Sequence, residues 1–313
     1  SLHDALPIYH RLKREIIATV LANRIVDLGG ITFMERARES ALADTGAVVR
    51  AFAGARKIFE LDKIIDAINA LDLKIPADVQ SSLMMDVIAI LRRQTYWLAR
   101  RAVNGGGLKP VGELVDIYTD GIAQLKKMIF DIVSNFEAAR LKDKAQTYID
   151  KGTPKELARE VASLRVLTSA TDIVDIANAK SISMEATARL YHSIGAHVGF
   201  DELRAHAGLA ITPDHWDRVA VRRIMEDFMA EQASMTESLI DFIKNDKELS
   251  SNIASPSRTW VDNAMKAWLD KNKDTFARTQ AALKELSASG GWTFAKLSIA
   301  NTQLKEFANQ SMA

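Results

Sequence analysis

The 313-residue sequence contains no cysteine, which excludes disulfide frameworks, thiolate zinc sites and cysteine nucleophiles. Its absence fits a reducing compartment, so we expect a cytoplasmic protein. A net charge of one sign is missing too, because 41 lysine and arginine residues are balanced by 40 aspartate and glutamate residues. No net field therefore draws the chain toward nucleic acid or an anionic membrane, and we expect no nucleic-acid partner.

Long hydrophobic runs are also missing. An apolar stretch such as IIATVLAN at 16–23 is far shorter than the roughly 20 residues that a membrane span requires. We therefore expect no membrane association. The first residues, SLHDALPI at 1–8, lack the charged and apolar segments of a signal peptide. They resemble translated sequencing adapter, and we treat them as a non-native scar.

Helical periodicity dominates the sequence that is present. In REIIATVLANRIVDLGG the apolar residues recur at three- and four-residue steps, which places them on one face of a helix: Ile16, Ile17, Val20, Leu21, Ile25 and Leu28. Gly29 follows this helix, and we interpret it as a left-handed C-cap. A phosphate cradle at Gly29-Gly30 is the alternative, but that site needs a strand before the glycines and a helix after them. The predicted helix comes first.

Helix start signals recur in the second half of the chain. In GTPKELAREVASL, Thr153 is predicted as an N-cap and Glu156 as its capping-box partner. In ITPDHW, Thr212 is predicted to cap a second helix start, and Ser255 or Ser257 is predicted to cap a third. Few alternating β-branched runs compete with these patterns, so we predict an all-α fold, a helical bundle of two packed helical subdomains.

The segment 76–101 is predicted to form a long helix with an apolar stripe at Met84, Val87, Ile88, Leu91 and Leu98. Arginines and aromatic residues gather near its end. Nucleic-acid binding is one interpretation, but balanced charge favours a solvated or interface face, with Tyr96, Trp97 and Arg100 as the contact surface. The glycines of NGGGLKP mark a domain boundary at 105–110, between subdomains at 9–104 and 111–313.

We identify no catalytic, cofactor-binding or metal-binding residue. His192 and His197 are five residues apart, whereas a histidine pair on one helix face needs a spacing of four. The carboxylates show no isolated apolar pair that would separate two pKa values. Neither common nucleotide fingerprint occurs. The glycines of YHSIGAHVGF are interpreted as sites of close helix packing or helix ends, with ligand binding as the alternative.

One stretch carries a family pattern. The segment HRLKREIIATVLANRIVDLGGITF, from His10 to Phe33, resembles the start of the C-terminal helical region of the large bacterial NAD-dependent glutamate dehydrogenases. The pattern is carried by His10, Leu12, Arg14, Glu15, Ile16, Ala18, Thr19, Asn23, Thr32 and Phe33. Arg11 departs from it, because that family usually has proline there. Further stretches match in the same order at 55–101, at 161–204 and near the C-terminus.

The resemblance implies membership in an enzyme that oxidatively deaminates L-glutamate to 2-oxoglutarate and ammonia with NAD. The NAD-binding fold and catalytic residues of that family lie upstream of this region, so the resemblance implies that the fragment alone binds no cofactor and is inactive. The expected partners are the catalytic domain of the same chain, adjoining residues 9–104, and further copies in a homo-oligomer. A free-standing helical scaffold or ligand-sensing module without catalytic activity is the alternative.

Overall fold

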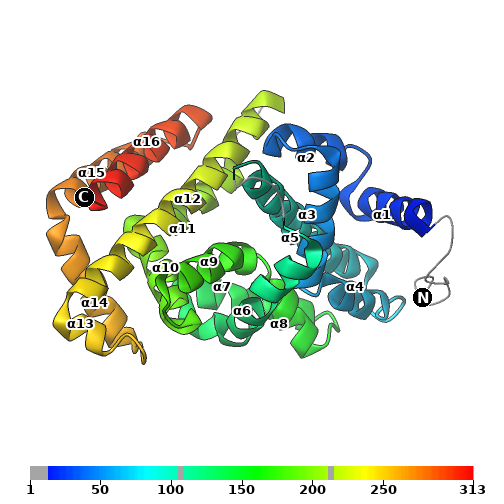
Figure 1. Ribbon diagram of the computed structural model, residues 1–313, viewed down its shortest axis with the longest axis horizontal. Helices are drawn as coiled ribbons and strands as arrows, with labels where there is room; N and C mark the ends of the chain where they lie inside the picture. Colours follow the sequence, from blue (N-terminus) through cyan, green and yellow to red (C-terminus); the bar gives the residue numbers. More distant parts are fainter. Residues whose placement is uncertain (1–12, 105–108, 211–214, 313) are drawn as a thin grey trace. The chain divides into compact units, whose positions relative to one another are not determined.

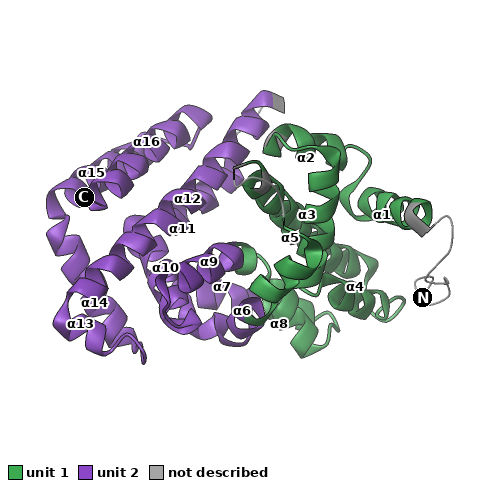
Figure 2. Ribbon diagram, viewed as in Figure 1, with its two compact units in different colours: residues 1–120, 144–168 green, residues 121–143, 169–313 purple. Residues whose placement is uncertain are grey.

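The computed structural model describes residues 13–104, 109–210 and 215–312. Every regular element within these ranges is a helix and none is a strand (Figure 1). The predicted all-α fold is therefore confirmed. The chain divides into two compact units, each built from separated stretches of sequence (Figure 2).

Unit 1 comprises residues 1–120 and 144–168, and unit 2 comprises residues 121–143 and 169–313. Helices α6 (Val111–Ile132) and α7 (Asn135–Ile149) each contribute residues to both units. The predicted boundary at 105–110 falls largely outside the described residues and stays a prediction.

Unit 1 is organised around one long helix, α5 (Ala77–Asn104). The shorter helices of the unit are α1 (Lys13–Gly29), α2 (Phe33–Ala41), α3 (Thr45–Ile58), α4 (Leu61–Asn69) and α8 (Lys155–Ser163). Helices α2, α3, α4 and α8 all pack against α5. Its apolar stripe is buried at Val87, Leu91 and Leu98, and the core reaches Phe52 of α3. Burial of this stripe supplies the main driving force for unit 1.

Polar side chains also tie α5 to its neighbours. Asp86 accepts a hydrogen bond from the Tyr148 hydroxyl and pairs with the Lys144 ammonium, both at 2.7 Å. Burial, helped by the Asp86 carboxylate, raises the pKa of Tyr148 to about 12, so the phenol keeps the proton that it donates. The buried amide of Gln94 donates to the Thr168 carbonyl at 2.8 Å. These contacts hold α7 and the segment after α8 on α5.

The Gly29-Gly30 pair ends α1. The predicted left-handed cap at Gly29 is wrong by one position, because Gly29 is helical and Gly30 has a φ of +85°. Gly29 is needed for another reason, since a Cβ there would lie 2.6 Å from the Phe33 ring. Arg92 of α5 donates to the Gly29 carbonyl at 2.6 Å and so satisfies the C-terminal end of α1. The pair is thus a helix end and not a phosphate cradle.

Among the described residues, no single helix has both the length and the hydropathy of a membrane span. Glu15–Gly29 and Phe33–Glu39 reach that hydropathy only as a pair, and they meet at a bend of 89°.

Unit 2 is organised around α12 (His215–Asn245). Its other helices are α9 (Ala170–Lys180), α10 (Met184–Val198), α11 (Phe200–Leu209), α13 (Lys247–Ser251), α14 (Arg258–Lys271), α15 (Lys273–Ala288) and α16 (Phe294–Ser311). The 3₁₀ turn at Val166–Ser169 before α9 contributes residues to both units. Helices α9, α10, α11, α13, α14 and α16 pack against α12, and α15 packs on α16. The core contains Phe228 of α12, Trp268 of α14 and Phe307 of α16, all buried.

The predicted helix caps have different outcomes. Thr153 and Glu156 do not form a capping box: Pro154 occupies the N-cap position of α8 without a side-chain cap, and the Thr153 hydroxyl is buried with no hydrogen-bond partner. The chain turns at Gly152, with a φ of +95°, and this turn places Thr153 one residue before the cap. Ser257 is confirmed, because it accepts from the Trp260 N–H at 3.1 Å. Thr212 lies outside the described residues.

Replacing Gly30 by alanine should lower the free energy of unfolding by about 1–2 kcal/mol, because an L-residue pays a steric penalty in the left-handed region. The matched control is Gly208→Ala in α11, where a Cβ meets open space and alanine favours the helix. Chemical denaturation followed by circular dichroism measures both. Equal stability of the two variants would contradict a conformational requirement at Gly30.

Candidate functional site

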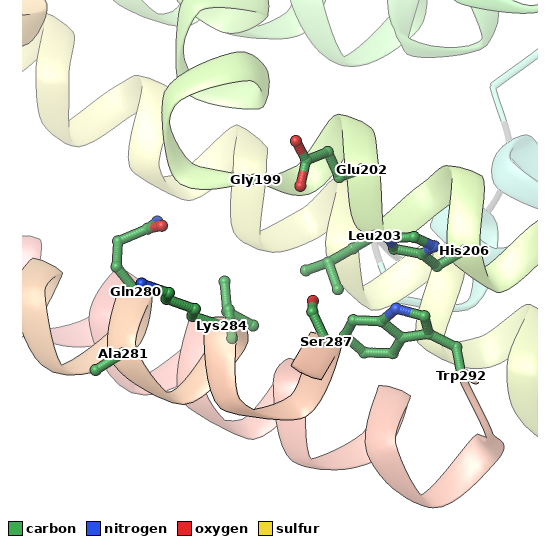
Figure 3. A pocket seen from close by; sticks show the side chains of 10 residues that line it. Gly199, Glu202, Leu203, His206, Gln280, Ala281, Lys284, Ser287 and Trp292 are labelled. Carbon is green, nitrogen blue, oxygen red and sulfur yellow. The ribbon is translucent and has the colours of Figure 1, made fainter. Parts of the chain in front are cut away.

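A pocket of about 440 Å³ in unit 2 lies between α11 and the segment from α15 to the start of α16 (Figure 3). Its walls carry acidic, basic, hydroxyl and aromatic side chains. The lining consists of Gly199, Glu202, Leu203, His206, Gln280, Ala281, Leu283, Lys284, Ser287 and Trp292. Since small-molecule sites combine an apolar surface with a few polar groups, this pocket is the candidate functional site.

Gly199 positions the first wall. It ends α10 with a φ of +102° and directly precedes α11, so α11 follows α10 without an intervening loop. Phe200 then packs on Phe228 of α12, with ring centroids 6.2 Å apart. Residues 199, 203 and 206 follow the three- and four-residue spacing of one helix face, which is the face turned to the pocket. The predicted role of this glycine as a helix end is confirmed.

The opposite side of α11 is held by a network of two half-buried charged side chains and one buried amide. Arg204 donates to the Asp201 carboxylate at 2.6 Å and to the Gln232 amide oxygen at 2.5 Å. The Gln232 amide in turn donates to the Tyr191 carbonyl of α10 at 2.7 Å. A Cβ at Gly195 would lie 2.8 Å from the Gln232 nitrogen, so glycine permits this approach. The predicted close helix packing in YHSIGAHVGF is confirmed at Gly195.

The second wall is fixed at the middle of α15 and beyond its C-terminus. Gln280, in the middle of the helix, donates to the Val198 carbonyl at 3.0 Å. Beyond the C-terminus, the Lys296 ammonium donates to the carbonyls of Gly290 and Gly291, at 3.0 and 3.1 Å. This tie holds the turn that carries Trp292. The Trp292 indole stacks on the His206 ring of α11, with centroids 5.0 Å apart and an interplanar angle of 17°.

Two residues of opposite charge line the pocket, one on each wall. Glu202 extends from α11 and Lys284 from α15 (Figure 3). Both residues are exposed, and within the described part of the chain neither side chain has a hydrogen bond or ion pair. They are therefore available to a ligand from solution.

His192 lies beside this network on α10. Its Nε2 is buried and has no hydrogen-bond partner among the described residues. Desolvation lowers the pKa of His192 to about 4, with partial opposition from the Asp201 carboxylate and a further contribution from the Arg204 guanidinium. The imidazole is consequently neutral in the folded protein near pH 7. His197 is exposed, and its Nδ1 lies 2.9 Å from the Ser193 carbonyl.

The predicted contact residues on α5 lie in unit 1 and are not part of this pocket. Tyr96 and Trp97 are half-buried, and both have ring partners inside unit 1. The ring centroids of Phe33 and Tyr96 are 5.6 Å apart, and those of Tyr118 and Trp97 are 6.0 Å apart. Arg100 is half-buried as well. These three side chains are therefore half-buried and not fully exposed. Their role as an interface stays a prediction.

A second hollow, of about 500 Å³, lies at α13 and α14 and includes Trp260. Two carboxylates line it, and one of them, Asp246, already accepts the N–H groups of Glu248 and Leu249 as an N-cap. In the described ranges, no three histidine, aspartate or glutamate side chains come together as a metal site. The same ranges contain no strand, and so offer no strand–glycine–helix cradle for a dinucleotide.

Comparison with known proteins identifies the family. A family model described as "Glutamate dehydrogenase, C-terminal" matches residues 8–306. The chain belongs to this family. The resemblance seen in the sequence is confirmed, and it extends over nearly the whole chain.

Three curated relatives are named NAD-specific glutamate dehydrogenase. The proteins from Halomonas elongata and Pseudomonas aeruginosa are each 27% identical to this chain over 302 residues, and that from Mycobacterium tuberculosis is 24% identical. Each alignment covers 96% of this chain and 18% of the relative. This member of the family thus spans less than a fifth of the length of these relatives.

The pocket was not foreseen from the sequence. Its wall residues are about 80 positions apart, and no local pattern pairs Glu202 with Lys284. A usable signal was present only on α11, where Glu202 and His206 repeat at a spacing of four. The partner helix could not be identified without the fold.

The buried state of His192 predicts acid sensitivity. Because its pKa is about 4 when folded and 6.5 for the free side chain, protonation favours the unfolded chain. The stabilisation is complete above pH 6.5 and should be lost as the pH falls toward 4. His192→Gln should flatten this part of the stability curve, measured by urea denaturation at each pH, whereas His197→Gln on the same helix should leave it unchanged. Identical curves for wild type and His192→Gln would contradict burial of the imidazole.

Proposed function

We propose that this chain is the C-terminal helical part of an NAD-dependent glutamate dehydrogenase. Such an enzyme oxidatively deaminates L-glutamate to 2-oxoglutarate and ammonia, with transfer of a hydride to NAD. The observation that carries the proposal is the match to the C-terminal family over residues 8–306, together with relatives more than five times as long. In this proposal the chain contributes to assembly or regulation, and the chemistry belongs to another part of the polypeptide.

The composition of the candidate site supports catalysis by another part of the polypeptide. Hydride transfer requires a protein framework that positions the nicotinamide against the substrate. The pocket between α11 and α15 is lined by one lysine and one glutamate, a set that does not fit a dinucleotide pyrophosphate. We therefore place NAD binding and catalysis outside this chain.

The amphipathic helix α1 supports a contact with the rest of the polypeptide. Its C-terminal half is buried at Ile25 and Leu28, whereas Val20, on the N-terminal half of the same stripe, is 43% exposed. Ile16 and Ile17 beside it are only half-buried. In this proposal another part of the longer polypeptide, whose length the relatives indicate, covers this surface. Burial of such apolar side chains stabilises an interface.

Val20 is a better position than Trp97 for testing assembly. Replacing Trp97 by alanine would remove its ring contact with Tyr118 and the stacking of Arg101, whose guanidinium carbon lies 4.5 Å from the ring centroid. A defect of the Trp97→Ala variant would therefore report on the stability of unit 1. Contact through Tyr96, Trp97 and Arg100, formation of a homo-oligomer and a cytoplasmic location remain proposals from the sequence.

The 313-residue chain alone should be helical, should not form NADH from glutamate and NAD, and should not bind the dinucleotide measurably. Circular dichroism, absorbance at the NADH band and calorimetry test these three statements. Glutamate-dependent turnover by the chain would refute the assignment of catalysis to another part of the polypeptide.

In the full-length polypeptide, Val20→Asp should weaken assembly by about tenfold or more, because it places a charge in an apolar contact. The matched control is Ala22→Asp, which introduces the same charge on the exposed opposite face of α1. Light scattering measures assembly. Equal assembly of the two variants would exclude the α1 stripe as the contact.

A free-standing helical module, the alternative function, predicts that no upstream dehydrogenase domain exists in the reading frame.

A further inference from the structure

Three large apolar side chains are exposed at one end of unit 2, and together they form what we call the tip surface. Leu209 at the end of α11 is 83% exposed, Trp216 in the first turn of α12 is 75% exposed, and Phe294 at the start of α16 is 37% exposed. Tryptophan is mostly buried in folded proteins, as Trp260 and Trp268 are in the same unit. The exposure of Trp216 therefore calls for a physical reason.

A ring contact joins the end of α11 to the start of α16. His206 precedes Leu209 by about one turn of α11 and stacks on the Trp292 ring, with centroids 5.0 Å apart (Figure 3). Phe294 follows Trp292 by two residues. Leu209 and Phe294 thus lie at the same end of unit 2.

The helices α12 and α16 bring Trp216 to this end. They pack side by side and run in the same direction, and Asn301 of α16 donates to the Asp227 carboxylate of α12 at 3.2 Å (Figure 1). Trp216 precedes Asp227 by about three helical turns, so it lies on the face of α12 that meets α16. Phe294 precedes Asn301 by about two turns and lies on the facing side of α16. Both aromatic residues therefore lie along one seam, at its N-terminal end.

An arginine borders the tip surface. Arg223 is exposed and follows Trp216 by about two turns on the same face of α12. Its guanidinium lies 3.6 Å from the Asp227 carboxylate. Tryptophan and arginine are the residue types that contribute most to binding energy at protein interfaces. A gathered set of apolar side chains beside such a group is typical of a protein-binding surface, whereas single exposed apolar residues are common everywhere.

The length of the relatives indicates what covers this surface. The alignments span 18% of each relative, so more than four-fifths of such a polypeptide lies outside the matched region. That remainder is the largest protein surface available to a chain of this family. A partner present in every copy of the polypeptide also explains how large apolar side chains are kept away from solvent.

We propose that the tip surface docks onto an apolar surface of the remaining part of the same polypeptide, with Trp216 at the centre of the contact and Arg223 at its polar rim. The inference rests on the proposed function, because it needs the longer polypeptide as the partner. It concerns unit 2 and is independent of the contact proposed for α1.

The test is hydroxyl-radical footprinting with mass spectrometry, applied to the 313-residue chain and to the full-length polypeptide. In the 313-residue chain, the three residues of the tip surface should be oxidised readily. In the full-length polypeptide their oxidation rates should fall roughly threefold or more, because a covered side chain loses contact with solvent. The matched control is Phe136 of α7, which is 68% exposed in the same unit and should keep its rate.

Three footprinting results would overturn the proposal. Unchanged rates at the tip surface in the full-length polypeptide would show that the remaining part does not cover it. Protection already present in the 313-residue chain would identify another segment of this chain as the occupant. Protection of the 313-residue chain that increases with its concentration would identify a second copy.

Variants assign the contact to Trp216. In the full-length polypeptide, Trp216→Asp should restore the oxidation rate of Leu209 to that of the 313-residue chain, because a charge is excluded from an apolar contact. Trp216→Phe should retain the protection, and so should the matched control Phe136→Asp. The unfolding midpoint of the 313-residue chain should stay unchanged in Trp216→Asp, since the side chain is mostly exposed. Protection of Leu209 that survives Trp216→Asp would refute the central role of this residue.

Glutamate-dependent NADH formation by the same full-length preparation separates the two proposals. Turnover together with an exposed tip surface would contradict the docking inference alone. A protected tip surface without turnover would contradict the proposed function alone.

Discussion

The hydrogen bonds of one buried amide hold the candidate site together. Gln232 is fully buried in the middle of α12, where an amide must find partners for its oxygen and nitrogen. The nitrogen donates to the Tyr191 carbonyl of α10, and the oxygen accepts from Arg204 of α11. Three helices are thereby joined at one point. Gly195 allows the Gln232 amide to approach α10, because a Cβ at residue 195 would lie 2.8 Å from the amide nitrogen.

The hydrogen bonds at Gln232 give the two faces of α11 different roles. One face is held by the network, and the other lines the pocket. Asp201 and Arg204 are half-buried and are engaged in the network, whereas Glu202 and His206 line the pocket. A helix held rigidly on one side can present charged groups on the other at low conformational cost. His192 lies beside the same junction and stays neutral through burial. Stability and ligand access are therefore linked in one segment of the chain.

Unit 1 uses a different arrangement around α5, where the polar side chains act on helix ends and neighbouring helices. Arg92 satisfies the last carbonyl of α1, and Asp86 anchors Lys144 and Tyr148 of α7. The aromatic residues of α5 fill gaps against α2 and α6. Arginine and aromatic side chains of α5 that resemble an interface in the sequence thus have partners within unit 1. The sequence pattern of α5 did not reveal these partners, because they lie on other helices.

The sequence by itself determined the helical class, the positions of the apolar stripes and the family, because periodicity, capping preference and ordered motif matches are local properties of the chain. Ser257 as a cap and the two glycine roles in YHSIGAHVGF follow from such local rules. Only the tertiary structure decided that Gly30 takes the left-handed position, that Thr153 precedes the cap, and that Glu202 shares a pocket with Lys284. Each of these depends on how the chain turns between helices or on which distant helix arrives, and no spacing within one segment contains that information.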